Sequence, residues 1–425
     1  MKKEKIPSSR CKSGSRQECK IDSDFRRNDN KFVGILLLLL GFLYFFYTIF
    51  SNSKFLFKKY DSISAEKIYS QSQWQQSQNI SEIKVLDEWA LKNGYTGWRN
   101  FEDETVNKLK IESQKLKVIQ DIKNKGVSDS FLYSYVGYKY MKGANPSLLN
   151  PEHPPLAKYL IGYSIQLFGS EHSMGIGVAF LILLLGAIIS YQLYSSLFLA
   201  GLTLFLTSIF PLFTDQITHG PQLELYQLFF FLLVIHFLLM GKKKNNTLFI
   251  IGAGIFFGML LSTKTFLPFF VLFSAWIALY FWKRWKMTVM VIGIGVFVFV
   301  ATYWQYFALG GTLRTFLGVQ KYIFIFYGNA QIPLFEFMGN YLRLIFTGSW
   351  KFWDSARSIS AYSEWNILWP LLFLLGMLRI KSRWTINPSS RLLIIFIILY
   401  NIFVFIIPVF PRYLLLLFVP LIILI

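Results

Sequence analysis

The feature that most constrains this chain is a series of ten apolar segments, most of them close to the length needed to cross a bilayer. They lie at about 32–50, 173–192, 194–212, 222–240, 247–262, 266–282, 287–308, 366–379, 391–409 and 413–425. A transmembrane helix needs ~20 predominantly apolar residues, and 54% of the 425 residues are hydrophobic. The sequence therefore predicts an all-α, polytopic membrane protein with about ten transmembrane helices.

The distribution of charge predicts how these helices are oriented. The net charge of +20 would suggest a nucleic-acid partner in a soluble domain, but here Lys and Arg gather at the ends of apolar segments. Residues 1–31 carry ten Lys or Arg against five Asp or Glu, which predicts a cytoplasmic basic tail. Alternating the segments then places Lys242-Lys243-Lys244, Lys283-Arg284-Trp285-Lys286 and the stretch 379–391 inside. We expect membrane lipids as partners and no nucleic acid.

The same alternation divides the rest of the chain. We expect a single transmembrane domain at 32–425, with an external loop at 51–153 and a second external region at 309–365 that forms re-entrant or surface helices. Only thirteen residues follow Arg412, and at about 1.5 Å per residue they fall short of the ~30 Å hydrocarbon core. We therefore expect the sequence to be a truncated part of a longer protein.

The external loop predicts several helices and one anion site. Residues 104–125 and the aromatic stretch 131–141 are suited to helices, the second lying at the membrane interface. The paired prolines of Pro151-Glu152-His153-Pro154-Pro155 favour the start of an amphipathic helix over about 156–167. Glu152 and His153 would then lie at a positive helix N-terminus, where a phosphate binds well.

Four ionisable residues adjoin the apolar segments on the predicted outer side. They are Glu224, Lys264, Glu364 and Arg412. A charge at membrane depth costs at least a few kcal/mol, so we expect these groups to face a cavity lined by protein or water. The alternative for any single residue is that its side chain reaches the membrane interface and has no function.

A resemblance to a known family rests on motifs spread over the chain from residue 129 onward. Asp129-Ser130, an aromatic stretch and Asn150-Pro151-Glu152-His153-Pro154-Pro155-Leu156-Ala157-Lys158 resemble the first external loop of polyprenyl-phosphate-dependent GT-C glycosyltransferases. This superfamily includes protein O-mannosyltransferases and lipid A aminoarabinose transferases. Weaker motifs follow in the family's order: His219-Gly220-Pro221-Gln222-Leu223-Glu224, Ser262-Thr263-Lys264-Thr265, Tyr362-Ser363-Glu364-Trp365 with Trp369-Pro370, and Phe410-Pro411-Arg412-Tyr413-Leu414.

The chain departs from the family pattern at its acidic residues. Ser130 stands where the family has Glu, and Glu224 stands where it more often has Asp. About eighty residues separate the first apolar segment from Asp129, so Asp87-Glu88 or Asp103-Glu104 are alternative acidic pairs. We favour Asp129 because its spacing to His153 matches the family.

The resemblance implies transfer of a sugar from a polyprenyl-phosphate donor to a protein, lipid or glycan acceptor, with inversion. Because nucleotide sugars are unavailable outside the cytoplasm, we expect the reaction on the external face of the plasma membrane. The implied catalytic residues are Asp129 as base, Glu224 as the second choice of base, and His153. The implied substrate-binding residues are Glu152, Lys158, Lys264, Glu364 and Arg412, with the cations holding the departing phosphate. No cofactor is required, although Glu152, His153 and Asp129 together could hold a divalent ion.

Two other classes of protein explain less of the sequence. A transporter or flippase would show internal repeats and charged or broken helices at mid-membrane, whereas the ionisable residues here lie at segment ends. A non-enzymatic assembly protein would explain the external loop but not the ordered acidic and basic residues. Cys11 and Cys19 both lie in the polar tail without a neighbouring His, so we expect neither a zinc site nor a disulfide.

Overall fold

The computed structural model is helical almost throughout. It describes residues 16–70, 127–147, 149–264, 266–281, 286–329, 334–352 and 358–425. The α-helices are α1 (Arg16–Ser51), α2 (Ser53–Leu56), α3 (Ser62–Ser70), α7 (Asp129–Met141), α8 (Leu156–Phe168), α9 (Ser173–Tyr194), α10 (Leu197–Ile209), α11 (Pro211–Thr218), α12 (Leu223–Lys244), α13 (Thr247–Leu261), α14 (Phe266–Phe281), α15 (Lys286–Ala301), α16 (Trp304–Ala308), α17 (Leu313–Asn329), α18 (Asn340–Thr347), α19 (Leu368–Ile386), α20 (Arg391–Ile406) and α21 (Leu415–Leu424). Two 3₁₀ helices, η1 (Leu334–Phe337) and η2 (Pro411–Leu414), and two short strands complete the described elements.

Each of the ten predicted apolar segments coincides with a helix, but the helices differ in length. Within the described residues, three are long and apolar enough to cross a membrane: Asn30–Ser51 of α1, α9 and α12. The pair α10–α11 makes a fourth if it is one span bent by 56°. α13, α14, α15, α20 and η2–α21 are apolar but shorter. The protein is thus an integral, multi-pass membrane protein.

Breaks within the predicted segments account for the difference from ten full-length spans. Pro211 begins α11 directly after Phe210, so the segment predicted at 194–212 becomes two helices at an angle. Thr302 and Tyr303 separate α15 from α16 in the same way. Hydrophobicity therefore located the segments, while local breaks set their lengths.

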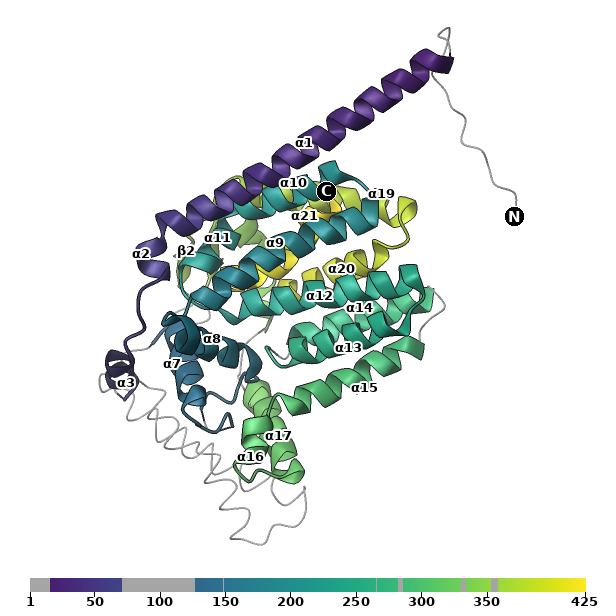
Figure 1. The fold of residues 1–425 in the computed structure, drawn as a ribbon. Coiled ribbons are helices and arrows are strands. Elements are labelled where there is room, and N and C mark those ends of the chain that lie inside the picture. The colour runs from purple at the N-terminus through teal and green to yellow at the C-terminus, as the bar shows by residue number, and fades with distance from the viewer. Residues whose placement is uncertain are drawn as a thin grey trace.

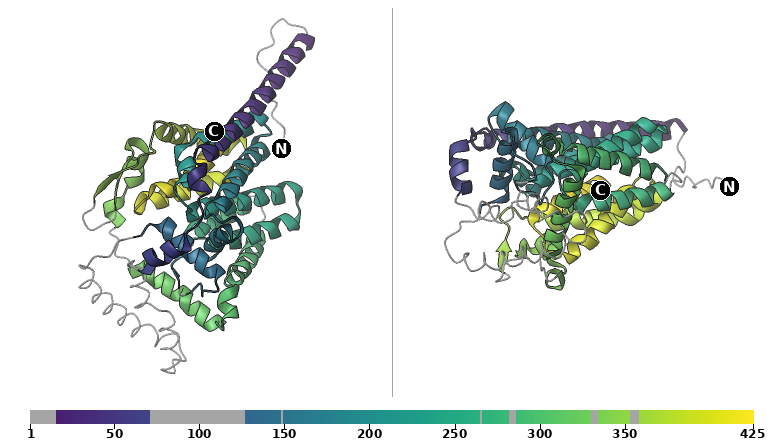
Figure 2. Two further views of the ribbon diagram at one scale, coloured as in Figure 1. Left: turned by 60° about the vertical axis from the view of Figure 1, so that its left-hand side comes forward. Right: turned by 90° about the horizontal axis from the view of Figure 1, so that it is seen from below.

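The long helices lie side by side, and α3, α7 and α8 gather at one end of the bundle (Figure 1). Figure 2 shows the same arrangement from two further directions. α1 packs along α10, and α21 contacts α9, α10, α12, α19 and α20. Every residue of α21 from Leu415 to Leu424 is buried. This apolar helix is the centre of the bundle.

Polar contacts at the end of the bundle away from α7 join loops that the charge pattern predicts to be cytoplasmic. The ammonium of Lys242 donates a hydrogen bond to Ser389 Oγ at 2.9 Å. Asn387 donates to the backbone carbonyl of Leu193, and Arg383 Nε donates to the carbonyl of Leu424 at 2.9 Å. Because these loops meet one another, the structure is consistent with the alternating topology.

Helices α7 and α8 pack closely through a pair of glycines. A Cβ on Gly137 would lie 2.5 Å from the backbone oxygen of Lys158, and a Cβ on Gly162 would collide with the Gly137 backbone. Only glycine allows helix backbones to approach so closely. This contact fixes α7, which begins at Asp129, against α8, which begins just after the paired prolines. Both stretches are thus helical, and their location at the external membrane interface stays a prediction.

The region at 309–365 contains the predicted short helices and one feature that was not predicted. α17 and α18 lie there, followed by an antiparallel pair of strands, β1 (Ser349–Lys351) and β2 (Ile359–Ala361). Two strands of three residues carry too little periodicity to be recognised in a sequence. The helix expected at 104–125 lies outside the described residues.

The alternating topology is testable by cysteine labelling. In a variant lacking Cys11 and Cys19, we expect Ile63→Cys to react with a membrane-impermeant maleimide in intact cells, because α3 belongs to the external loop. Lys243→Cys should react only after the cells are permeabilised. The opposite pattern at these two exposed positions would contradict the arrangement.

Candidate active site

Arg412 is the centre of a network of charges at the α7 end of the bundle. Its guanidinium Nη2 is ion-paired with Oδ2 of Asp129, the first residue of α7. Its Nε lies 3.2 Å from Oε1 of Glu224, which is in the first turn of α12. The Arg412 side chain is only 18% exposed, so its charge needs these partners. The first turns of α7 and α12, both far from η2 in the sequence, thus meet at Arg412.

A second cation completes this network. The ammonium of Lys264, in the loop after α13, lies 2.7 Å from the same Oε1 of Glu224 and 4.4 Å from the centre of the Tyr413 ring. Glu224 is 2% exposed, and its other oxygen, Oε2, has no hydrogen-bond partner among the described residues. Hereafter the charge cluster means Asp129, Glu224, Lys264 and Arg412.

The loop between α11 and α12 brings the two carboxylates together. Gly220 has φ of 114°, a backbone conformation that favours glycine. A Cβ at this position would lie 2.9 Å from Cβ of Ser130, so the loop runs directly against the start of α7. Gln222 in the same loop accepts a hydrogen bond from Arg412 Nη1 at 3.4 Å. Ser130, where the family has Glu, therefore lies at a tight backbone contact.

The side chain of Lys158 contacts the loop that precedes α8. Its side chain is fully buried, and its ammonium donates to the backbone oxygens of Asn150 and His153 at 2.6 and 2.7 Å. A third bond, 3.3 Å long, reaches Asn150 Oδ1. Because the first turn of α8 points back toward the loop, Lys158 fastens the turn 150–153 rather than facing open space. The substrate-binding role of Lys158 stays a prediction.

Glu152 and His153 lie in the turn that Lys158 fastens. Asn150 donates a hydrogen bond to the Glu152 carboxylate. Burial raises the pKa of Glu152, and the charge of Lys158 opposes this rise. Burial lowers the pKa of His153 well below its usual range, and the cations Lys264, Lys158 and Arg412 lower it further. The His153 imidazole is therefore neutral and adjoins the charge cluster.

The remaining predicted residues do not join this cluster in the described part of the chain. Glu364 is exposed in the turn after β2. The alternative acidic pairs Asp87-Glu88 and Asp103-Glu104 lie outside the described residues. No group of three or more His, Cys, Asp or Glu side chains in the described ranges is arranged to hold a metal ion.

A His–Asp pair next to the charge cluster escaped the sequence analysis. His219 Nδ1 lies 2.5 Å from Oδ1 of Asp215, one helical turn earlier in α11. Asp215 was not singled out because it lies between the apolar segments predicted at 194–212 and 222–240, in a stretch to which no helix was assigned. The signal that could have revealed it is the spacing of four residues at a helix end, which puts both side chains on one face.

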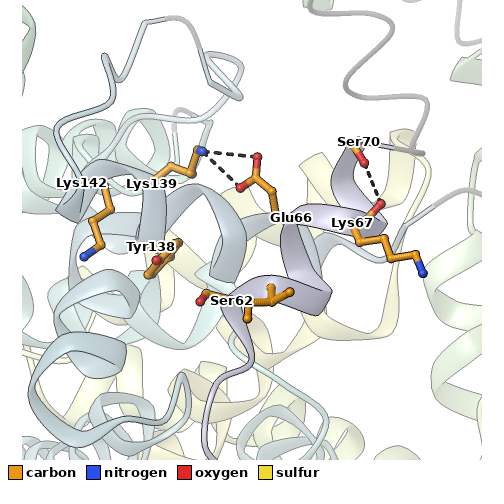
Figure 3. Close-up of a pocket in the computed structure, with 8 residues that line it drawn as sticks. Ser62, Glu66, Lys67, Ser70, Tyr138, Lys139 and Lys142 are labelled. Atoms are coloured by element: carbon orange, nitrogen blue, oxygen red, sulfur yellow. Dashed lines mark hydrogen bonds and ion pairs between the residues drawn. The ribbon is translucent and has the colours of Figure 1, made fainter.

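A surface pocket lies at the other end of α7 (Figure 3). It has a volume of about 570 Å³, and Figure 3 shows the ion pair of Lys139 with Glu66 across it. Its lining comes from α3 and the C-terminal part of α7: Ser62, Ile63, Glu66, Lys67, Ser70, Tyr138, Lys139 and Lys142. Lys139 is ten residues after Asp129, roughly 15 Å along a helix. The pocket shares no residue with the charge cluster.

Comparison with known proteins gives a similarity at the level of fold. No protein-family model matches the chain, and no curated protein matches it. The chain resembles ArnT from Cupriavidus metallidurans. The apo structure of ArnT covers 70% of this chain with 16% identity and a TM-score of 0.47, and the structure bound to undecaprenyl phosphate covers 69% with 17% identity and a TM-score of 0.45.

The alignment covers 54% and 53% of those two ArnT chains. This chain therefore spans about half the length of the solved structures that it matches. At these values the similarity concerns the fold, whereas the chemistry must be argued from the residues of the site.

The role of Lys158 in holding the turn 150–153 predicts the effect of replacing it. Lys158→Met leaves the oxygens of Asn150 and His153 without their donor, and each unsatisfied buried group costs ~1–3 kcal/mol. We expect the unfolding temperature in detergent to fall by several degrees. A matched exposed variant, Lys142→Met, should leave it unchanged. An unaltered unfolding temperature in Lys158→Met would show that the turn does not depend on this ammonium.

Proposed function

We propose that the protein is a membrane glycosyltransferase that moves a sugar from a polyprenyl-phosphate donor to an acceptor at the external face of the plasma membrane. The observation that supports this most is the charge cluster, in which two cations and two carboxylates from four separate segments meet at one end of the bundle. Well-packed apolar side chains at these positions would stabilise a helical bundle at least as well as this desolvated network does. A charged substrate explains why it is there.

The cations suit the phosphate of a lipid donor. Arg412 and Lys264 are 18% and 12% exposed and lie at helix ends, where a lipid phosphate at headgroup level could reach them. Arg offers two parallel donors to phosphate oxygens, and Lys adds a point charge. Neutral His153 beside them could donate a further hydrogen bond. One of the ArnT structures also holds a lipid of this class, undecaprenyl phosphate.

Binding of the donor would free the base. A phosphate that binds Arg412 must compete with the carboxylates already paired to it, and Asp129 is 39% exposed whereas Glu224 is 2% exposed. Asp129 is therefore the partner that yields. Once released from Arg412, its carboxylate is available to accept the proton of the acceptor hydroxyl. Donor binding thus prepares the group that activates the acceptor.

The reaction that follows is a single displacement. A hydroxyl oxygen of the acceptor attacks the anomeric carbon, its proton passes to Asp129, and the bond from the anomeric carbon to the phosphate oxygen breaks. The electron pair leaves with the polyprenyl phosphate, whose charge Arg412 and Lys264 stabilise. The new bond forms on the opposite face of the sugar, so the configuration inverts. No cofactor enters this scheme.

The other predicted residues take supporting roles in this proposal. Glu224 holds both cations, and its unpaired Oε2 could accept a hydrogen bond from a donor-sugar hydroxyl. Lys158 and Glu152 shape the turn that carries His153. Glu364, exposed in the second external region, would contact the acceptor, which is a protein, a lipid or a glycan. The tail 1–31 and the single domain from residue 32 remain predictions.

One observation favours a second candidate, a transporter or flippase of a lipid-linked sugar. The bend of 56° between α10 and α11 is of the kind that discontinuous helices in transporters show. The two functions differ in their product. A purified protein that moves a polyprenyl-phosphate sugar across a vesicle without cleaving it would support the transporter and contradict the transferase.

Loss of the base should reduce transfer without unfolding the protein. Asp129→Asn keeps the size of the side chain but accepts no proton at neutral pH, so we expect transfer to fall by at least ~10²-fold. A panel of polyprenyl-phosphate sugars with the purified protein measures the rate. Glu66→Gln, a carboxylate change in the Figure 3 pocket, serves as the control. Transfer close to normal in Asp129→Asn would assign the base to another residue.

Loss of the central cation should weaken donor binding. We expect Arg412→Ala to raise the Kd for polyprenyl phosphate by ~10-fold or more, because a charge-assisted bidentate contact is lost. Arg343→Ala, which removes an exposed arginine of the second external region, should leave this Kd unchanged. Should Arg412→Ala bind the lipid like the wild type, the phosphate is held elsewhere.

A further inference from the structure

The pair of Asp215 and His219 has an unusual division between buried and exposed groups. The Asp215 side chain is 9% exposed, whereas the His219 imidazole that it contacts is 64% exposed. The contact joins Asp215 Oδ1 to His219 Nδ1. A buried carboxylate therefore holds one nitrogen of an imidazole whose other atoms face outward.

Asp215 is occupied on both oxygens. Its Oδ2 accepts a hydrogen bond from Gln216 Nε2 at 3.0 Å. Tyr362, from the turn after β2, lies beside it: burial raises the pKa of the Tyr362 hydroxyl, and the nearby charge of Asp215 raises it further. Asp215 thus has no oxygen directed at open space. Its effect on anything outside the protein must pass through His219.

The pair flanks the charge cluster. Gly220, the residue after His219, packs against Ser130, which follows Asp129. Gln222, two residues further on, accepts a hydrogen bond from Arg412. α11 itself contacts η2, the helix that carries Arg412. His219 is therefore the exposed group beside a cluster whose cations are largely enclosed, and it lies on the side from which an acceptor could approach.

The geometry fixes which hydrogen bond His219 offers. Because a carboxylate only accepts, the bond to Asp215 keeps the proton on Nδ1 in the neutral imidazole. Nε2 then carries the lone pair of the ring, so it accepts a hydrogen bond from a hydroxyl or an amine and repels an anion. A histidine that merely capped the C-terminus of α11 would need no buried carboxylate behind it. A dyad of this form is the usual means of orienting an imidazole.

We propose that His219, oriented by Asp215, is the acceptor-recognition site of this enzyme. Nε2 accepts a hydrogen bond from a neutral hydroxyl of the acceptor and holds that group beside Asp129, on the opposite side from the donor phosphate. The acceptor is accordingly hydroxyl-bearing and uncharged at this point of contact. This inference rests on the proposed function, since it assigns the second substrate of the same site.

The first experiment separates acceptor binding from donor binding. Transfer is measured for the wild type, His219→Ala, Asp215→Asn and the double variant, with a methyl glycoside and a Ser/Thr peptide as acceptor probes. We expect the acceptor KM to rise ~10-fold in His219→Ala and less in Asp215→Asn, with the double variant no worse than His219→Ala. The Kd for polyprenyl phosphate should stay within about twofold. Thr218→Ala, the neighbouring position, is the control.

The second experiment tests the dyad without any turnover. Diethyl pyrocarbonate modifies accessible, neutral imidazoles, and mass spectrometry locates the product. We expect His219 to react fastest among the four histidines, Asp215→Asn to slow its reaction, and the methyl glycoside to protect it while polyprenyl phosphate does not.

The outcomes separate the two proposals. An unchanged acceptor KM in His219→Ala, or equal losses of donor and acceptor binding, would overturn the inference and leave the transferase intact. If the wild type transfers sugar to none of a glycan, a peptide and a lipid acceptor, the proposed function is contradicted. In that case the rates of modification by diethyl pyrocarbonate still test whether Asp215 orients His219. If His219 reacts equally fast in the wild type and in Asp215→Asn, the dyad is overturned.

Discussion

The pairing of Arg412 with Asp129 and Glu224 is the interaction on which the rest of the external end depends. A guanidinium that is 18% exposed cannot be left without partners, because uncompensated charges in a dry site cost several kcal/mol. Its position therefore fixes where α7 and α12 begin. Lys264 joins through Glu224, so the loop after α13 is tied to the same point. At this end of the bundle the segments meet through charged side chains, whereas elsewhere they meet through apolar packing.

The network is also poised to be disturbed. The Glu224 carboxylate is buried, whereas the Asp129 carboxylate is partly exposed. An anion that approaches Arg412 from outside therefore displaces Asp129 more easily than Glu224. The buried carboxylate keeps the cations in place while the partly exposed one moves. In such an arrangement, the free energy of donor binding releases the carboxylate of Asp129, which then acts on the acceptor. The neutral imidazole of His153 adds a donor without adding charge.

Much of the fold could be predicted from the sequence, because the position of an apolar segment requires only composition. The charged residues of the cluster could be predicted for the same reason, since a charge beside an apolar segment stands out. The contacts of Lys158 could not be predicted, because only the structure shows that its side chain reaches the carbonyl oxygens of Asn150 and His153. Backbone acceptors have no sequence signature. The strands β1 and β2 escaped because their pairing is not local and their length is only three residues each.

The Asp215–His219 pair was missed for a different physical reason. Its buried half, Asp215, lies in the stretch 213–221 between two predicted apolar segments, to which no element was assigned. The break at Pro211 turns that stretch into a short separate helix with an exposed end. Once α11 is known to be a helix that ends at Thr218, the spacing of four residues shows that the two side chains share one face.

The burial of α21 has a consequence for how the protein senses its membrane. Leu415–Leu424 contact protein on all sides, so the helix that continues from Arg412 has no boundary with lipid. By contrast, α1 presents many apolar side chains outward, among them Leu43, Tyr47 and Phe50 at 65%, 67% and 80% exposed. The outer helices α15 and α19 also present exposed apolar side chains, Phe297 at 73% and Leu378 at 76%, so a change in acyl-chain length or fluidity would act first on these outer helices. The central cation would keep its depth, and the site would work alike in bilayers of different thickness.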